Sequence, residues 1–133
     1  MRMIFVNLPV KDLNATKAFF SSLGFSYNPQ FSNENGACMI VEENISVMFL
    51  QQDYFRTFIN GEIADPAKGV EVLNCLSCDS RQAVDDIVAK ALAGGGKPWK
   101  PVADHGWMYG WSFQDLDGHV WEVMYADPTA IPS

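Results

Sequence analysis

Histidine, cysteine and positive charge are all scarce in this chain. Its 133 residues include 2 His and 3 Cys, and 9 Lys and Arg stand against 16 Asp and Glu, giving a formal net charge of -7. This acidic balance excludes the basic surface that binds nucleic acid or an anionic membrane. An odd number of cysteines without a secretory leader is typical of reduced thiols, so we expect a cytoplasmic protein.

Long apolar segments are also missing. The first residues, MRMIFVNLPVKDL, are interrupted by Asn7, Pro9 and Lys11 and are too short for the core of a signal peptide. No run approaches the roughly 18 apolar residues of a membrane-spanning helix. The chain is nevertheless 48% hydrophobic and 13% aromatic, which suits a packed core. Its length is typical of one domain, so we expect residues 1–133 to form a single domain.

Cys75 and Cys78 form a Cys-x-x-Cys pair inside an apolar segment, VEVLNCLSC. Such a pair can be a redox centre or half of a zinc site. Side chains three positions apart on a strand point to opposite faces, and the chain has no second pair to complete a zinc site. We therefore favour two small apolar residues of a strand.

The chain divides into two similar halves. In each half a strand leads to a residue that can cap a helix, Asp12 or Ser80, and the helix ends at glycine. Three further strands follow each helix, so the expected strands are 3–10, 25–31, 37–43, 45–52, 70–78, 97–102, 106–115 and 119–127. The pattern predicts an α+β fold of two tandem βαβββ modules, about 3–52 and 70–127. Helices would cover one face of each sheet and leave the other face to line a ligand cleft.

Residues 53–69 join the two modules. This linker is rich in aromatic and apolar residues, which could form a short helix or a lid over the cleft. We favour simple packing of these side chains on the core.

Three segments resemble one known family. They are VKDL at the start of the first helix, FFSSLGF at its end, and Asp115-Leu116-Asp117-Gly118-His119-Val120-Trp121-Glu122 near the end of the chain. With the paired βαβββ plan, they resemble the vicinal oxygen chelate superfamily, which comprises glyoxalases, bleomycin resistance proteins and extradiol dioxygenases. The chain looks most like small glyoxalase-like proteins often labelled predicted lactoylglutathione lyases. The resemblance spans residues 3–126, departs from the family at Leu116, where Pro is usual, and implies a curved mixed sheet and a homodimer.

The resemblance also implies a divalent metal bound by four residues, from the first and last strands of each half. Carried over to this sequence, the four positions fall on Phe5, Phe49, Leu73 and Glu122. Only Glu122 offers a donor atom, and one carboxylate holds a divalent ion weakly. We therefore expect no metal cofactor. A shift of two residues along the strands would instead place an all-oxygen set, suited to Mg²⁺ or Mn²⁺, at Asn7, Gln51, Glu71 and Glu122.

The cleft is then expected to be apolar with one acid. Glu122 is the candidate catalytic residue, its pKa raised by burial unless a donor such as Asn7 pairs with it. The expected ligand-binding residues are Phe5, Asn7, Phe49, Leu73, Met108, Ser112 and, at the rim, His105. The sequence leaves open whether Met108, Gly110 and Ser112 or Trp107, Tyr109 and Trp111 face inward, and family hairpin geometry favours the former. His119 is interpreted as a turn residue.

Three functions remain open. The leading hypothesis is a glyoxalase-like protein that binds a small organic ligand without metal and either sequesters it or transforms it through Glu122. The second is a metal-dependent lyase or dioxygenase with displaced ligands. The third is a resistance protein for bleomycin-type antibiotics, since an acidic, aromatic-rich chain suits a cationic, planar ligand.

Overall fold

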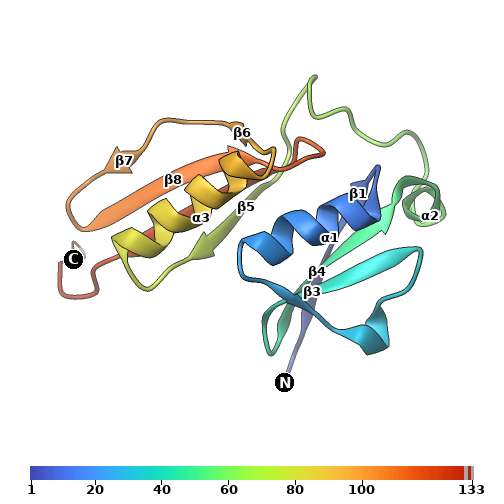
Figure 1. Cartoon of the computed structure of the whole chain (residues 1–133), viewed down its shortest axis with the longest axis horizontal. Coiled ribbons are helices and arrows are strands. Elements are labelled where there is room, and N and C mark those ends of the chain that lie inside the picture. Colours follow the sequence, from blue (N-terminus) through green and yellow to red (C-terminus); the bar gives the residue numbers. More distant parts are fainter. Residues whose placement is uncertain (131, 133) are drawn as a thin grey trace. The chain divides into compact units, whose positions relative to one another are not determined.

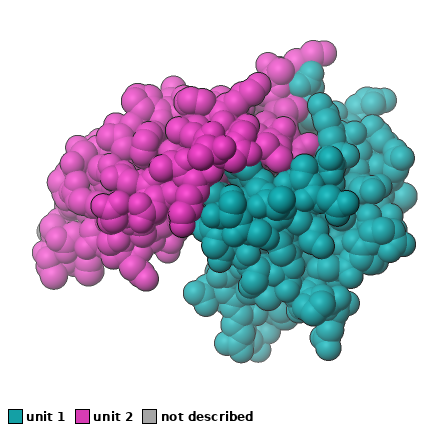
Figure 2. Space-filling view, in the orientation of Figure 1, with its two compact units in different colours: residues 1–65 teal, residues 66–133 magenta. Residues whose placement is uncertain are grey.

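A computed structural model describes residues 1–130 and 132 of the chain. It contains two compact units, Met1–Asp65 and Pro66–Ser133, which Figure 2 shows in different colours. The boundary between the units lies inside the linker expected at 53–69. Each unit carries its own sheet and its own long helix (Figure 1).

Unit 1 follows the expected order of elements. Its helices and strands are β1 (Ile4–Val10), α1 (Leu13–Ser22), β2 (Ser26–Tyr27), the 3-10 helix η1 (Pro29–Phe31), β3 (Gly36–Glu42), β4 (Ile45–Gln51) and α2 (Gln52–Arg56). The strand order is β1-β4-β3-β2, with β1 parallel to β4 and the other pairs antiparallel.

Unit 2 repeats the same plan. Its elements are β5 (Leu73–Ser77), α3 (Arg81–Ala93), β6 (Lys97–Pro98), β7 (Ala103–Asp104), β8 (Met108–Gln114) and β9 (Val120–Ala126). The strand order is β5-β9-β8-β6, β7 also pairs with β8, and β5 runs parallel to β9. The prediction of an α+β fold with two βαβββ modules is therefore confirmed.

Both long helices begin where the sequence predicts. The Asp12 carboxylate accepts a hydrogen bond from the backbone N–H of Ala15 at 3.1 Å, and the Ser80 hydroxyl oxygen accepts one from Ala83 at 3.0 Å. These bonds satisfy backbone donors that have no partner within the first turn of a helix. Within the part of the chain that the structure describes, no helix is long and apolar enough to cross a membrane.

The core of each unit lies between its helix and one face of its sheet. In unit 1, the rings of Phe20 and Phe49 stack with centroids 4.8 Å apart. In unit 2, Val84 and Val88 of α3 are fully buried, and Trp121 of β9 is almost so. The opposite face of each sheet carries no long helix of its own unit and is called here its open face.

Three expected strands are clearly shorter than predicted, and one of them, 70–78, is reduced to Leu73–Ser77. The segment 25–31 pairs only at Ser26–Tyr27, because Pro29 then starts the 3-10 helix. The segment 97–102 splits into β6 and β7, and residues 99–102 between them form no ladder. Pro101 in that gap lacks the N–H that a strand would donate.

Candidate ligand pocket

The register of unit 2 fixes which side chains share its open face. Between β8 and β9, Ser112 pairs with Glu122 and Gly110 pairs with Met124. Between β5 and β9, Cys75 pairs with Glu122. Tyr109 points the other way, since its hydroxyl donates to Asp85 of α3 at 2.6 Å. Because faces alternate along a strand, Met108, Gly110 and Ser112 lie on the open face, as the family hairpin favours.

A pocket of about 230 Å³ lies on this open face. Its walls come from the sheet and from the segment between β6 and β8, and they consist of Cys75, Lys100, Pro101, Ala103, Met108, Gly110, Trp111, Ser112, Glu122, Val123 and Met124. Most of these side chains are apolar, and only Lys100 and Glu122 carry charge. A concave, mostly apolar site with few polar groups is typical of small-molecule binding.

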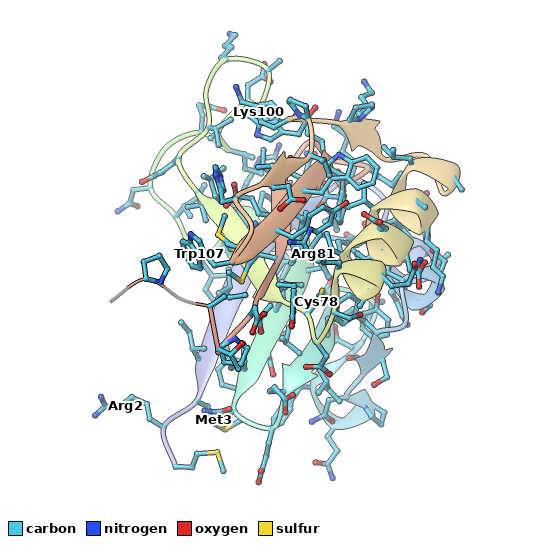
Figure 3. The ribbon with its side chains drawn as sticks, turned by 90° about the vertical axis from the view of Figure 1, so that its left-hand side faces the viewer. Arg2, Met3, Cys78, Arg81, Lys100 and Trp107 are labelled. Carbon is cyan, nitrogen blue, oxygen red and sulfur yellow. The ribbon has the colours of Figure 1, made fainter. Side chains whose placement is uncertain are left out.

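Ser112 shapes this pocket from beneath. Its side chain is buried, and its hydroxyl oxygen accepts a hydrogen bond from the backbone N–H of Lys100 at 3.0 Å. The bond fixes the backbone of the segment that carries Lys100, a residue labelled in Figure 3, to Ser112 of β8. Ser112 was expected to bind ligand directly, and the structure gives its hydroxyl a partner within the protein.

Glu122 is the half-buried acid of the pocket. Among the described residues its carboxylate has no hydrogen bond or ion pair, and its negative charge acts on the thiol of Cys75. Burial raises the pKa of the Cys75 thiol above its ordinary value, and the negative charge of Glu122 raises it further. The carboxylate is therefore available to a ligand.

Asn7, the donor that we expected beside Glu122, lies in unit 1. It shares the open face of that sheet with Phe5, and both side chains are exposed. The Asn7 amide donates to the backbone carbonyl of Phe5 at 3.3 Å.

The expected orientation of Phe49 is wrong. Its ring is fully buried against Phe20 of α1, so it belongs to the core of unit 1 and not to the open face. The residues of β4 that share the face of Phe5 are Ser46, Met48 and Leu50. Side chains alternate between the two faces of a sheet, so a shift of one residue along a strand reverses the face. The position carried over from the family falls on Phe49, whereas its neighbours Met48 and Leu50 lie on the open face.

Leu73 and His105 lie outside the pocket walls. Leu73 is on the face of Glu122, since it pairs with Val120, but it is 51% exposed near the end of the sheet. His105 is an exposed residue after β7, and its backbone N–H donates to the carbonyl of Met108 at 2.8 Å. The structure therefore brings together Glu122, Met108 and Ser112 of the expected set.

The residues present do not fit the divalent metal that the family resemblance implies. On the open faces, the strands β1, β4, β5 and β9 offer one carboxylate, Glu122, and no imidazole. Across residues 1–130 and 132, no three His, Cys, Asp or Glu side chains gather closely enough to hold a metal ion. The displaced set also fails, because Gln51 pairs with the core residue Val10 and so takes the face opposite Asn7.

The Asp-Leu-Asp-Gly-His motif builds the turn between β8 and β9. One carboxylate oxygen of Asp115 accepts the backbone N–H groups of Asp117 at 2.9 Å and His119 at 3.0 Å. The other accepts the indole N–H of Trp121 at 2.9 Å. Burial raises the pKa of Asp115, while His119 and these donors oppose the shift. The most specific motif of the sequence thus has a structural role, which agrees with the interpretation of His119 as a turn residue.

Sequence reasoning missed six residues of the pocket walls: Cys75, Lys100, Pro101, Ala103, Val123 and Met124. Cys75 was read as a strand residue of no functional meaning, although alternation places it on the face of Leu73. Met124 lies two residues after Glu122 and could have been found by the same rule. Lys100 comes from an irregular segment, and no local pattern in the sequence indicates that it reaches the sheet.

Solved structures with the same fold are numerous. A hypothetical protein from S. aureus has a TM-score of 0.81 and 23% identity, with 95% of each chain covered. A glyoxalase/bleomycin resistance protein/dioxygenase family enzyme from Burkholderia phytofirmans PsJN has a TM-score of 0.77 and 18% identity, covering 95% of this chain and 99% of that one. A genomically encoded fosfomycin resistance protein from Listeria monocytogenes has a TM-score of 0.68 and 18% identity, covering 97% of this chain and 96% of that one. At these identities the likeness concerns the fold alone.

The family itself is shown by sequence. No curated protein matches the chain. The model of the Glyoxalase/Bleomycin resistance protein/Dioxygenase superfamily, however, matches residues 2–123, from β1 through most of β9. With the repeated βαβββ units and the Asp115 turn, this match leads to one conclusion: the chain belongs to the Glyoxalase/Bleomycin resistance protein/Dioxygenase superfamily.

Proposed function

We propose that this protein binds a small organic ligand in the pocket on the open face of unit 2, without the divalent metal of its metal-dependent relatives. The observation that carries the proposal is the free carboxylate of Glu122 in an otherwise mainly apolar pocket. A partly desolvated carboxylate without a donor is costly, so a ligand that brings a donor gains binding energy there.

Glu122 acts first as the polar anchor of this ligand. Met108, Met124 and Ala103 supply apolar contact around it. Methionine side chains adapt to ligands of different shape, which suits binding and sequestration. A carboxylate that contacts a C–H or O–H group of the ligand can also accept its proton, so Glu122 is the residue through which metal-independent chemistry would proceed.

A panel of small amines, acids, alcohols and amides tests the proposal by ligand-observed NMR in buffer containing a chelator. We expect several members to bind with the chelator present. Glu122→Gln should weaken the binding of donor-bearing ligands about tenfold, since a hydrogen bond to a charged group contributes roughly 1.5–3 kcal/mol. The exposed Glu43 serves as the matched control, and Glu43→Gln should change nothing. Equal binding to both variants would reject the role of Glu122.

The lyase alternative predicts a different result. Isomerisation of a glutathione hemithioacetal that requires added Ni²⁺, Co²⁺, Mn²⁺ or Zn²⁺, with nearly one tightly bound ion per chain, would replace the metal-free proposal. Calorimetric binding of bleomycin at sub-millimolar concentration would favour the antibiotic-binding alternative. None of the residues that line the pocket points specifically to a metal-dependent lyase or to bleomycin binding.

The protein partner that we propose is a second copy of this chain. β1 and β5 are edge strands of their sheets, and each exposes large apolar residues, Ile4 and Phe5 in the first and Leu73 in the second. Unpaired edges with exposed apolar side chains favour association. Light scattering should give the mass of a dimer, and a monomer at all concentrations would reject this partner.

The compartment that we propose is the cytoplasm. Cys38, Cys75 and Cys78 are all free thiols in the structure. Free thiols persist in a reducing compartment. Localisation of a tagged protein in cells tests the proposal, and export from the cytoplasm would overturn it.

A further inference from the structure

We propose that the natural ligand of the pocket is a zwitterion, in which an ammonium group and an anionic group are separated by a short apolar segment. The inference rests on the proposed function, because it names the class of ligand that would occupy the same pocket. It starts from the two charged residues of the pocket wall, Glu122 and Lys100.

The two charges do not neutralise each other. Among the described residues, neither Lys100 nor Glu122 takes part in an ion pair. The pocket therefore presents an unpaired carboxylate and an unpaired ammonium. A ligand with one charge satisfies only one of them, whereas a zwitterion satisfies both.

Ser112 connects the backbone segments that carry the two charged residues. Glu122 and Ser112 are direct partners across β8 and β9, and the Ser112 hydroxyl accepts the backbone N–H of Lys100 at 3.0 Å. Ser112 thus connects the two backbone segments from which the charged side chains extend. Because both side chains line one pocket, a ligand with two charges can reach both of them.

The surface around the two charges is apolar. Met108, Met124 and Ala103 also line the pocket, and none of their side chains carries a strong hydrogen-bond donor or acceptor. A ligand with adjacent charges and no apolar segment would leave this surface in contact with water. The complementary ligand therefore has a hydrocarbon or similarly apolar body between its charged ends.

The test uses calorimetry with a set of probes of equal length. The zwitterion is 6-aminohexanoate, the single-charge probes are hexylamine and hexanoate, and the uncharged probe is 1-hexanol. Homologues from 4-aminobutanoate to 8-aminooctanoate find the best separation of the charges. We expect the best zwitterion to bind about tenfold more tightly than either single-charge probe, which corresponds to about 1.4 kcal/mol for the second charged contact.

Two variants assign the two contacts. Glu122→Gln should weaken the binding of the zwitterion and of hexylamine and leave the binding of hexanoate unchanged. Lys100→Met should weaken the binding of the zwitterion and of hexanoate and leave the binding of hexylamine unchanged. Lys97→Met is the control, because Lys97 is exposed in β6 and does not line the pocket.

The outcomes separate this inference from the proposed function. If hexylamine, hexanoate or 1-hexanol binds as tightly as every zwitterion, the ligand class is wrong and the pocket remains a ligand site. If no probe binds, the ligand class is equally wrong, and the panel of small amines, acids, alcohols and amides decides on the pocket separately.

Discussion

The hydroxyl oxygen of Ser112 accepts a hydrogen bond from the backbone N–H of Lys100 at 3.0 Å. Ser112→Ala should leave this N–H without its partner and lower the free energy of unfolding by about 1 kcal/mol. The amide hydrogen of Lys100 should also exchange faster with solvent. Urea denaturation and hydrogen exchange measure the two effects. Ser77→Ala, on an exposed serine of β5, is the control, and equal effects of both variants would contradict the role of Ser112.

Phe49 and Phe5 provide a direct test of the faces of the first sheet. Phe49 is fully buried and stacked on Phe20, so Phe49→Ala should lower the free energy of unfolding by about 3–5 kcal/mol. Phe5 is 41% exposed, and Phe5→Ala should cost much less. Chemical denaturation of the two variants gives the comparison. A larger loss in Phe5→Ala would mean that the faces are reversed.

The thiol of Cys75 reports on the charge of Glu122. Because burial and Glu122 both raise its pKa, the thiolate should form only above the ordinary value of 9.0. The rate of alkylation by iodoacetamide, followed residue by residue with mass spectrometry, should reach half its maximum above that pH.

Glu122→Gln removes the negative charge, so the midpoint for Cys75 should move to lower pH. Glu43→Gln should leave it in place, because Glu43 is exposed and is not among the groups that raise the pKa of Cys75. A midpoint that is identical in wild type and Glu122→Gln would show that the carboxylate does not face Cys75.

The turn between β8 and β9 depends on the ability of Asp115 to accept three hydrogen bonds. Asp115→Asn keeps the shape but places an NH₂ group where a carboxylate oxygen accepts either the Trp121 indole or the backbone N–H groups. A donor would then face a donor, and we expect a loss of about 2–3 kcal/mol in the free energy of unfolding. Thermal and urea unfolding measure it. Asp53→Asn, on a side chain that is 94% exposed, is the matched control and should cost little.

The repeated fold was predictable because its signals are local. Asp12 and Ser80 cap their helices as expected, and the alternation of 106–115 and 119–127 matches β8 and β9. These features depend on residues within a few positions of one another. The family resemblance implied a mixed sheet, and β1–β4 and β5–β9 are parallel pairs within otherwise antiparallel sheets.

The site was less predictable because it depends on register and on distant contacts. Phe49 was assigned to the wrong face, since a change of one residue in register reverses a strand. Cys78 was placed in the strand of Cys75, but β5 ends at Ser77, so alternation does not apply to it. Lys100 reaches the pocket through a hydrogen bond to Ser112, twelve residues away, and nothing in the local sequence indicates that bond.

Gly110 offers the most direct control over the pocket. An added Cβ would meet the carbonyl oxygen of Val123 at 3.6 Å and the Cβ of Met124 at 3.9 Å, which are ordinary contacts. Gly110→Leu should therefore fold and extend its side chain into the pocket. Gly69→Leu is the control, because an added Cβ there meets no atom within 4 Å.

The decisive measurement is a two-dimensional NMR titration of these two variants and the wild type with the tightest ligand of the panel. We expect the shift changes to concentrate on Gly110, Ser112, Glu122 and Met124 in the wild type and in Gly69→Leu. In Gly110→Leu the Kd should rise at least about tenfold, since the side chain occupies the ligand volume. Unchanged affinity in Gly110→Leu, with shift changes elsewhere in the chain, would contradict the assignment of the ligand site to the open face of unit 2.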